Sequence, residues 1–577
     1  MRRRIMGEKL SELIKGLEIT SISSQEDPVV TSVCYDTRKE IGPGCLFVCI
    51  KGAKNDSHDF AGEAAAKGAV AVIAEREVEV PGDCVLVVTS DTRRALALIS
   101  AAFFGHPADK LTTIALTGTK GKSTTSYMIR DILEKSGRKC GVIGTIGIAY
   151  GDTKVAIGNS TPESYIIHEY FAKMVEAGCD SVVMEVSSQG LMQNRVYGIN
   201  YDCAVFLNLE QDHIGEGEHT CLEEYLYCKS ILFRSCKHAF FAVGDRHLAD
   251  ILEAAGIKDR VLAAKDSGKT EDALSGEKEA TEDSRERFKI WDEKFNITKV
   301  STLTADDCEG FGVEGGANTE EAMLQSADPA AAAKTSAEER GFFKKCTFAK
   351  DLKFTKKKED GTLKLGIDFK VDLASGEEEE MSLNIPGRYN VANAAAAIAV
   401  TSYLGAEAEA MREAFLSFSV CGRLEPVHVS DEFTLYIDYA HNAMALENVL
   451  LTLRAYDPGR LVCLFGCGGN RSKERRYTMG EVSSRLADLS VVTSDNPRFE
   501  KPADIIEDIL VGVKKDKGEY IVIENRREAI DYVIKNGRPG DIILLAGKGN
   551  EDYQEICGTK YPFDERVVIA ELMQGNR

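Results

Sequence analysis

A glycine-rich turn at residues 116–125, with the sequence LTGTKGKSTT, constrains this chain more than any other feature. A short apolar run at 111–116 precedes it, and residues 126–135 carry apolar side chains at helical spacing. A strand, a turn of this kind and a helix are the context of a phosphate-binding loop, because N–H groups at the helix N-terminus can surround phosphate oxygens. We therefore expect Lys122 to neutralise nucleotide phosphates, and Ser123 or Thr124 to offer a hydroxyl to Mg²⁺.

The spacing of this loop differs from the common form. Leu116 stands where the first glycine is usual, so the motif is a TGTxGKS variant. An ordinary tight turn is the alternative interpretation, and the flanking strand and helix favour the phosphate loop.

Composition limits the class of protein. At 577 residues the chain is long enough for three or four domains, and with 44% hydrophobic and 28% charged residues it is typical of globular proteins. A formal charge of −21 argues against a nucleic-acid partner, because such binding needs clustered Lys and Arg. No apolar run is long enough to span a membrane, and the basic start MRRRIM is not followed by an apolar segment, so we expect a cytoplasmic protein.

The 16 cysteines include no C-x-x-C pair. Several lie in apolar, strand-like sequence: Cys34, Cys45, Cys49, Cys463 and Cys467. We interpret them as small buried hydrophobic residues, and neither a disulfide framework nor a zinc site is expected.

Strand-like runs alternate with helical patterns along most of the chain, which predicts α/β domains with largely parallel sheets. Strands are expected at 45–50, 69–74, 85–89, 111–116, 182–186, 204–208, 435–437, 461–465, 489–493 and 542–546, with alternating strands over 348–383. An Ala-rich helix is expected at 60–67 and a linker at 105–109. Three domains follow, at 1–108, 109–420 and 421–577. Residues 264–344 are rich in Glu, Asp, Ala, Ser and Gly, and we interpret much of this segment as a solvated insertion.

Polar clusters follow several of these strands, where ligands bind in open α/β sheets. Glu185 ends one strand in MEVSSQGL, and Asp212 and His213 follow another in NLEQDHIG. Glu185 and His213 could complete a Mg²⁺ site begun by Ser123, although such a residue taken singly is more often a cap or a hydrogen-bonding group. Lys229, in YCKSILF, is by itself typical of a solvated helical lysine.

Further clusters occur later in the chain. Asn390 and Asn393 share one face of an Ala-rich helix, a pattern that also fits helix packing. Loops that combine glycine with charged residues then occur in CGRLEP, YIDYAHN, GCGGNRSKERR, SDNPR and AGKGNEDYQ. Such loops present backbone donors and charged groups together, which suits anionic ligands.

These segments, in this order, resemble the Mur ligases, and within them the enzymes that form the UDP-N-acetylmuramoyl-tripeptide. The motifs that carry the resemblance are YDTRKEIGPGCLFVCIKG, TGTKGKSTT, GNSTPES, MEVSSQGLMQNRV, IDYAHN, FGCGGNRSKERR, SDNPR and AGKGNEDYQ. The resemblance implies a UDP-MurNAc-binding N-terminal domain, a central ATPase-like domain and a Rossmann-like C-terminal domain that binds the amino acid. It also implies an ATP-dependent amide ligase, expected as a monomer, that acts in peptidoglycan precursor synthesis.

In this family ATP phosphorylates the D-glutamate carboxylate of UDP-MurNAc-L-Ala-D-Glu, and the amine of an amino acid displaces the phosphate. The resemblance gives catalytic roles to Lys122 at the phosphates, to Ser123 and Glu185 at one Mg²⁺, to His213 at a second Mg²⁺, and to Lys229 as a metal-binding carbamate formed with CO₂. The ATP-binding residues it implies are Thr117, Gly118, Thr119, Lys120, Gly121, Lys122, Ser123, Thr124, Asn390, Asn393, Arg423, Asp438 and His441.

The other two substrates are assigned in the same way. The contacts implied for the UDP-MurNAc-dipeptide are Thr37, Asn159, Ser160, Thr161, Ser187, Gln193 and Arg195. Those implied for the amino acid are Arg471, Asp495, Asn496, Arg498, Gly547 and Glu551. A guanidinium can bind a carboxylate through two parallel hydrogen bonds, so Arg498 favours meso-diaminopimelate, whose far end carries a second carboxylate and ammonium.

Three positions depart from the family pattern: Lys120, Gln189 and Asn550 stand where Asn, His and His are usual. The segment IGEGEHTCLEEY after His213 also differs from the usual one. Two alternatives remain open, the same chemistry with L-lysine or another diamino acid, and a catalytically silent nucleotide-binding paralogue. Folate and cyanophycin ligases share the phosphate loop, but are not expected to carry YDTR, EVSSQGLMQNR and SDNPR together.

Overall fold

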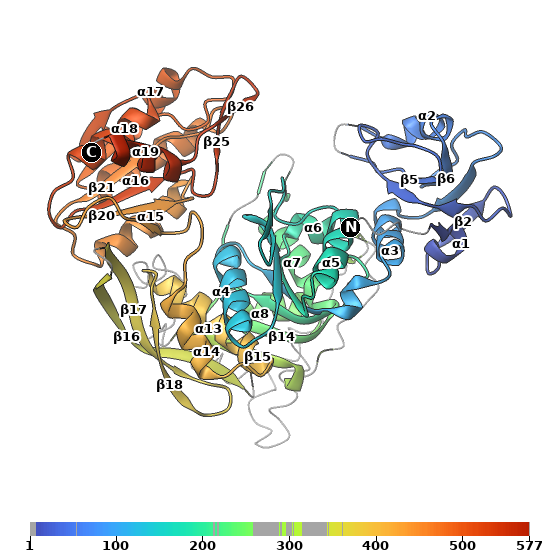
Figure 1. Cartoon of the computed structure of the whole chain (residues 1–577), viewed down its shortest axis with the longest axis horizontal. Coiled ribbons are helices and arrows are strands. Elements are labelled where there is room, and N and C mark those ends of the chain that lie inside the picture. The colour runs from blue at the N-terminus through green and yellow to red at the C-terminus, as the bar shows by residue number, and fades with distance from the viewer. Residues whose placement is uncertain are drawn as a thin grey trace. The chain divides into compact units, whose positions relative to one another are not determined.

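The structure is a computed structural model. It describes residues 7–52, 55–211, 214–215, 218–257, 288, 291–292, 294–295, 303, 305–313, 343, 345–359 and 362–575. These form two compact units, one of Met1–Ser126, Gly137–Phe241 and Arg246–Cys308, the other of Tyr127–Ser136, Ala242–Asp245 and Glu309–Arg577. Figure 1 labels their helices and strands.

The first unit begins with a five-stranded sheet in the order β2-β7-β6-β5-β4, in which only β2 is antiparallel to its neighbour. The elements are β1 (Glu8–Lys9), α1 (Leu10–Leu13), β2 (Ile19–Ile22), β3 (Val29–Val30), β4 (Ser32–Cys34), β5 (Cys45–Val48), η1 (Ser57–Phe60), α2 (Ala61–Ala66), β6 (Ala69–Ala74), β7 (Val85–Thr89) and α3 (Thr92–Phe103). The strands predicted at 69–74 and 85–89 are confirmed, and the one predicted at 45–50 ends at Val48. Cys34, Cys45 and Cys49 are buried, as expected.

The phosphate-loop sheet follows, with strand order β11-β10-β9-β12-β8-β13-β14. Its strands lie in the first unit except for the last residue of β14, whereas residues 127–135 of the helix after the phosphate loop belong to the second unit. Its elements are η2 (Pro107–Lys110), β8 (Thr112–Thr117), α4 (Lys122–Lys135), β9 (Cys140–Gly144), β10 (Gly147–Tyr150), β11 (Thr153–Val155), α5 (Ser164–Glu176), β12 (Ser181–Glu185), α6 (Ser188–Met192), β13 (Tyr201–Phe206), α7 (Leu222–Ser230), η3 (Ile231–Arg234), β14 (Cys236–Ala242) and α8 (Leu248–Ala254). Strands β9, β12, β8, β13 and β14 run parallel to one another, whereas β10 is antiparallel to both β9 and β11.

This parallel sheet places the functional loops at one edge. Strand β12 is buried along its whole length, as expected for a strand covered on both faces. Because the strands are parallel, the phosphate loop after β8, Glu185 at the end of β12 and Asn208 after β13 lie at the same carboxyl edge. The helix predicted from residue 126 begins earlier, at Lys122, so the loop's own Lys-Ser-Thr-Thr forms its first turn.

The short helix η4 (Ala305–Asp307) lies near the end of the first unit. The second unit carries all but the first residue of β15 (Cys308–Val313), and it carries β16 (Cys346–Glu359), β17 (Thr362–Asp372) and β18 (Glu378–Leu383); these strands neighbour one another in that order. Helices α13 (Arg388–Tyr403) and α14 (Ala408–Leu416) follow. Strand β15 lies inside the segment 264–344, and Phe311 and Val313 are buried there, so this part of the segment is not solvated. Its short apolar run is hard to recognise among polar neighbours, and most of the remaining insertion lies outside the described residues.

The C-terminal sheet has the order β19-β20-β24-β21-β22-β23 and is parallel except for β19. Its elements are β19 (Glu425–Val427), β20 (Thr434–Asp438), α15 (Ala443–Arg454), β21 (Leu461–Phe465), α16 (Lys473–Leu486), β22 (Leu489–Val492), α17 (Pro502–Val513), β23 (Glu519–Val522), α18 (Arg526–Lys535), β24 (Ile542–Ala546), β25 (Tyr553–Ile556), β26 (Thr559–Pro562) and α19 (Glu565–Gly575). The predicted strands at 461–465 and 542–546 are confirmed with the same bounds.

Two apolar layers cover this C-terminal sheet (Figure 1). Alternate residues of β24 face them, with Leu544 in the layer of α15, α16 and α17, and Leu545 in the layer of α18 and α19. Cys463 and Cys467 are buried in the first layer, as expected. Helices thus cover both faces of a largely parallel sheet, as the sequence predicts, and the loops at the carboxyl ends of the strands carry the site residues.

Candidate active site

The phosphate loop is held in shape by the strand beside it. Asn208, which follows β13, accepts hydrogen bonds through Oδ1 from the backbone N–H groups of Thr119 (3.0 Å) and Lys120 (2.8 Å). Its Nδ2 donates to the Lys120 carbonyl at 3.2 Å. Lys122 folds back over the loop, with Nζ donating to the carbonyls of Gly118 (2.7 Å) and Thr119 (3.0 Å). The loop therefore has a fixed backbone and a lysine at its centre, as phosphate binding requires.

Ser123 and Glu185, predicted to share a metal, lie in direct contact. Ser123 Oγ donates to Glu185 Oε1 at 2.8 Å, and Thr145 donates to the same carboxylate through its N–H (2.9 Å) and Oγ1 (3.0 Å). Glu185 is 1% exposed, and a β-carbon at Gly144 would lie 2.2 Å from its Oε1. The buried carboxylate is thus held at one place, beside a hydroxyl, and oxygen donors of this kind suit Mg²⁺.

Lys229 is not a solvated helical lysine. It is 1% exposed on α7, and its Nζ donates to the Gly118 carbonyl at 2.9 Å. The Nζ also lies 4.3 Å from the centre of the Tyr225 ring, and the Tyr225 hydroxyl lies 3.2 Å from Thr119 Oγ1. The structure therefore brings Lys229 to the phosphate loop. Asp212 and His213 lie outside the described residues, and elsewhere in the described chain no three His, Cys, Asp or Glu side chains form a metal-binding group.

The residues predicted to bind the UDP-MurNAc-dipeptide form a chain that starts at Glu185. Thr161 Oγ1 donates to the Glu185 carbonyl (3.0 Å) and accepts from the Ser187 N–H (2.9 Å). Arg195 donates to the Thr161 carbonyl (2.7 Å) and to Gln193 Oε1 (2.7 Å). Burial lowers the pKa of Arg195, although the Glu163 carboxylate at 3.2 Å opposes this. The structure therefore groups these residues around one half-buried guanidinium.

The other predicted UDP-MurNAc residues lie apart from this chain. Asn159 is exposed and Ser160 is half-buried in the loop before Thr161. Thr37 is half-buried in the N-terminal domain, between Asp36 and Arg38, whose side chains form an ion pair at 2.7 Å.

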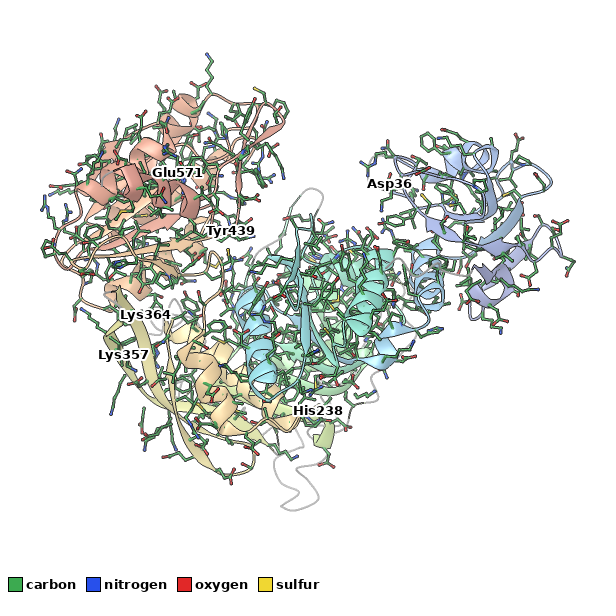
Figure 2. All side chains as sticks on the ribbon, viewed as in Figure 1. Asp36, His238, Lys357, Lys364, Tyr439 and Glu571 are labelled. Carbon is green, nitrogen blue, oxygen red and sulfur yellow. The ribbon has the colours of Figure 1, made fainter. Side chains whose placement is uncertain are left out.

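The predicted ATP contacts of the second unit fall on two elements. Asn390 and Asn393 are buried on α13, and Asn393 Nδ2 donates to Asn390 Oδ1 at 3.2 Å. Arg423 lies 4.8 Å from the centre of the Tyr439 ring, and the Tyr439 carbonyl lies 2.8 Å from Nδ1 of the exposed His441. Figure 2 labels Tyr439. The structure brings Arg423 and His441 together through Tyr439, while the two asparagines form a separate pair.

Asp438 stands at the end of β20, close to the same loop. Its carboxylate accepts the N–H groups of Leu424 and Ala440, each at 2.8 Å, and burial raises its pKa. These hydrogen bonds fix the backbone directly after Arg423 and directly before His441, two of the residues that the sequence assigns to ATP.

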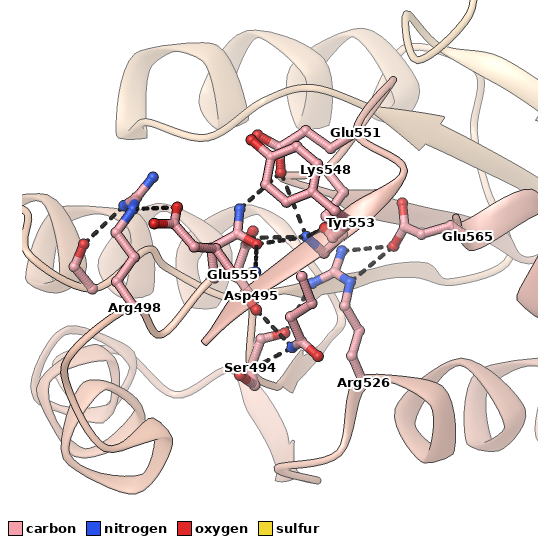
Figure 3. A network of polar contacts seen from close by, with 12 residues as sticks. Ser494, Asp495, Arg498, Arg526, Lys548, Glu551, Tyr553, Glu555 and Glu565 are labelled. Atoms are coloured by element: carbon pink, nitrogen blue, oxygen red, sulfur yellow. Dashed lines mark hydrogen bonds and ion pairs between the residues drawn. The ribbon is translucent and has the colours of Figure 1, made fainter. Parts of the chain in front are cut away.

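The predicted amino-acid residues meet in a polar network (Figure 3). Asn496 Nδ2 donates to Glu551 Oε2 at 2.8 Å, and burial raises the pKa of Glu551. A β-carbon at Gly547 would lie 2.7 Å from Asp495 Oδ2. Arg498 pairs with Glu555 at 3.1 Å. Arg471 is exposed and has no contact within this network in the described part of the chain.

Three family models match the chain. They are the Mur ligase family catalytic domain at residues 29–104, the Mur ligase middle domain at 116–304, and the Mur ligase glutamate ligase domain at 422–549. A protein of Caldanaerobacter subterraneus subsp. tengcongensis is 36% identical over 567 residues, which cover 98% of this chain and 99% of the relative. Its name is UDP-N-acetylmuramoyl-L-alanyl-D-glutamate--2,6-diaminopimelate ligase. This chain belongs to the Mur ligase family.

Other relatives agree. A protein of the same name from Clostridium perfringens is 34% identical over 98% of this Mur ligase and 99% of the relative. Another, from Aquifex aeolicus, is 34% identical over 93% of this Mur ligase and 92% of the relative. A solved structure of a ligase with that name has 25% identity and a TM-score of 0.60, with 99% of both chains covered. A crystal structure of MurF from Acinetobacter baumannii, 17% identical with a TM-score of 0.57 over 98% of this chain and 99% of that one, shares the fold.

Several residues that build the site of this Mur ligase were missed from the sequence. Asn208, Thr145 and Tyr225 shape the phosphate loop and its carboxylate. Lys548 is fully buried in the amino-acid network, where Nζ donates to Asn496 Oδ1 (3.0 Å) and the Tyr553 carbonyl (2.7 Å). The motifs NLEQDHIG and AGKGNEDYQ include Asn208 and Lys548, but nothing in a sequence pattern marks which member of a motif is turned inward.

Aromatic residues from the predicted insertion pack beside α7. Tyr227 stacks with Trp291 and Phe295, at ring-centre distances of 6.4 and 5.9 Å. Lys294 Nζ lies 2.6 Å from the buried Glu224 carboxylate on α7. This part of the insertion is therefore packed against the helix that carries Lys229, which the composition of the segment did not indicate.

The three departures from the family pattern have different environments. The backbone of Lys120 is bound by Asn208. Gln189 Oε1 accepts from Gln193 Nε2 at 3.3 Å on α6. Asn550 is half-buried next to Gly549. Among the described residues, no helix is long and apolar enough to cross a membrane.

Proposed function

We propose that this Mur ligase uses ATP to join meso-diaminopimelate to the D-glutamate of UDP-MurNAc-L-Ala-D-Glu. The observation that carries the proposal is the buried Ser123–Glu185 pair beside a rigid phosphate loop, in a chain that matches diaminopimelate ligases along nearly its whole length. The relatives' names supply the substrate, and the loop supplies a place for the nucleotide phosphates.

The chemistry begins with a carboxylate, which is a poor electrophile until one of its oxygens becomes a phosphate leaving group. Lys122 Nζ, 2.7 Å from the Gly118 carbonyl, would turn to the β- and γ-phosphates and neutralise charge as the γ-phosphoryl group moves to the D-glutamate carboxylate. The products are an acyl phosphate and ADP. The diamino acid's amine then attacks the acyl carbon, loses a proton, and expels phosphate to leave the amide.

Ser123 and Glu185 are the residues we propose for one Mg²⁺, with His213 at a second. The donor set fits, because a buried carboxylate already held by three donors lies against a hydroxyl. The metal would supply positive charge near the phosphoryl oxygens. Lys229 is proposed as a carbamate, because its amine lies beside the phosphate loop and reaction of a neutral amine with CO₂ gives a carbamate anion, which can bind a metal, and a proton.

The remaining assignments follow the same division. We propose Thr37, Asn159, Ser160, Thr161, Ser187, Gln193 and Arg195 for the UDP-MurNAc-dipeptide. Asn390, Asn393, Arg423, Asp438 and His441 are proposed for ATP, and Arg471, Asp495, Asn496, Arg498, Gly547 and Glu551 for the amino acid. Domain limits at 108 and 420, a cytoplasmic location and a monomeric state complete the proposal.

Omission of single substrates tests this function. The purified chain should release ADP and phosphate only when ATP, Mg²⁺, UDP-MurNAc-L-Ala-D-Glu and a diamino acid are all present. Lys122→Ala should abolish release, because the phosphates lose their cation. Unchanged turnover in Lys122→Ala would contradict the mechanism, and the absence of turnover in the wild-type chain would favour a silent nucleotide-binding paralogue.

The acyl phosphate has a separate test. When the D-glutamate side-chain carboxylate carries ¹⁸O, one labelled oxygen should leave with the released phosphate, because the bond that breaks is between the acyl carbon and that oxygen. Unlabelled phosphate would show that water or another group accepts the phosphoryl group.

A further inference from the structure

Glu555, on β25, has no role in the assignments above, yet it contacts the residue on which substrate choice depends. We propose that Glu555 is a positioning residue for amino-acid selection, which holds the Arg498 guanidinium so that its free end faces the second carboxylate of the incoming diamino acid. The inference rests on the proposed function, in which Arg498 binds that carboxylate.

The backbone of Arg498 is clamped by the same strand. Its N–H donates to the Glu555 carbonyl at 3.0 Å, and its own carbonyl accepts from the Cys557 N–H at 2.7 Å. Arg498 has a φ of 51°, in the left-handed region that residues with a β-carbon seldom adopt. These two hydrogen bonds hold a strained conformation, which fixes the direction in which the side chain leaves the backbone.

The guanidinium is then fixed at two of its nitrogens (Figure 3). Nε donates to Glu555 Oε2 at 3.1 Å, and Nη1 donates to the Gly469 carbonyl at 2.8 Å. Within the part of the chain that the structure describes, Nη2 has no hydrogen-bond partner. The side chains of Arg498 and Glu555 are 22% and 23% exposed, so the pair is partly buried and still accessible to a ligand. The terminal end of the guanidinium is thus the part that a substrate carboxylate can reach.

A glycine-containing loop contacts the guanidinium at Nη1, whereas Glu555 contacts it at Nε. A β-carbon at Gly468 would lie 2.9 Å from Nη1, so any larger residue would push the guanidinium away. Gly468 and Gly469 therefore let the loop after β21 approach Arg498, while Glu555 holds it from β25. The two contacts come from separate elements and together leave the guanidinium little freedom.

Fixing Arg498 in advance should favour a substrate with a second carboxylate. An arginine side chain has many rotamers, and ordering them at the moment of binding weakens binding. Glu555 orders the side chain beforehand, so the benefit goes to meso-diaminopimelate. L-Lysine lacks the far carboxylate, does not use the guanidinium, and gains nothing from the arrangement.

Steady-state kinetics of Glu555→Leu and Glu555→Gln test the inference. We expect Glu555→Leu to raise the KM for meso-diaminopimelate about tenfold, with kcat, the KM for ATP and the KM for L-lysine changed less than about twofold. Glu555→Gln should stay within about threefold of wild type, because the amide oxygen can still accept the Nε–H. Rescue by glutamine, together with an effect on one substrate alone, separates positioning from damage to the fold.

Glu571→Leu is the matched control. It breaks another glutamate–arginine pair of this domain, in which Glu571 Oε2 lies 2.5 Å from Arg527 Nη1, and it should leave the preference for meso-diaminopimelate unchanged. Equal preference in Glu555→Leu and wild type would overturn the inference and leave the proposed function intact. A wild-type chain that prefers L-lysine would overturn both.

Discussion

Ser123 Oγ and Glu185 Oε1 lie 2.8 Å apart, joined by a hydrogen bond between the first turn of α4 and the end of β12. The sequence places these residues 62 positions apart, and the parallel pairing of β8 with β12 brings them together. Thr145 adds two donors to the same carboxylate. The pair is therefore built into the edge of the sheet.

Ser123→Ala should weaken Mg²⁺ use without disturbing this edge, because Glu185 keeps both donors from Thr145. We expect kcat to fall about tenfold to a thousandfold, and the Mg²⁺ concentration for half-maximal phosphate release to rise. Ser126→Ala is the control, since the Ser126 hydroxyl donates to the Ser123 carbonyl on the same helix and has no contact with Glu185. Equal Mg²⁺ dependence in both variants would argue against Ser123 as a ligand.

Lys229→Arg should lower the rate of ligation at least about a hundredfold, because a guanidinium keeps the positive charge but cannot form a carbamate. With ¹³C-bicarbonate, the wild-type chain should show a carbamate carbon signal in its NMR spectrum that the variant lacks. The same signal in both proteins would place the carbamate on another amine, and full activity in Lys229→Arg would exclude it from the reaction.

Glu224→Gln should loosen the contact between α7 and the Trp291 segment in a pH-dependent way. Burial by itself raises the pKa of Glu224, but hydrogen bonds from Lys294 and Thr220 outweigh it and lower the pKa to about 2. A lowered carboxyl pKa stabilises the folded state above the ordinary value of 4.5, and this stabilisation is lost as the pH falls towards 2. We expect the Glu224 charge to contribute at most about 2 kcal/mol to the free energy of unfolding, because Lys294 is partly exposed and water screens the ion pair.

The only tryptophan of the chain, Trp291, reports this contact directly. Thermal melts followed by its fluorescence should show a lower midpoint for Glu224→Gln than for wild type at pH 6, and the difference should shrink below pH 4.5. A difference that is the same at pH 6 and pH 3 would mean that the Glu224 charge does not hold the segment.

The site residues at the carboxyl ends of the strands were predictable, because apolar runs mark the strands and a parallel sheet brings their carboxyl ends together. Glu185 and Ser123 were found in this way, and the strands at 69–74, 85–89, 461–465 and 542–546 have the expected bounds. Burial of single polar residues was not predictable. Lys229 and Lys548 look like surface lysines in the sequence, and their burial depends on long-range packing by α7 and β24.

The insertion residues that pack against α7, Trp291 and Phe295, were likewise not predictable from the sequence. Charged residues of both signs surround Trp291 in the sequence, and its aromatic partner Tyr227 lies 64 positions earlier in the chain, a spacing that no local pattern reveals. His213 lies outside the described residues, so its role at a second Mg²⁺ remains a prediction.

Arg498→Leu should lower kcat/KM for meso-diaminopimelate by about tenfold to a hundredfold, because two charge-assisted hydrogen bonds to the far carboxylate are lost. The value for L-lysine should change less than about threefold. Parallel kinetics with both diamino acids would measure this, and an equal loss for the two would mean that Arg498 supports the fold and does not select the substrate.

Competition between diamino acids tests the proposed function most directly. Wild-type protein is given ATP, Mg²⁺, UDP-MurNAc-L-Ala-D-Glu and equal concentrations of meso-diaminopimelate and L-lysine, and the products are weighed by mass spectrometry. We predict that the tripeptide containing diaminopimelate predominates and that ADP forms in equal amount. A product that contains mainly lysine, or no amide product at all, would contradict the proposal.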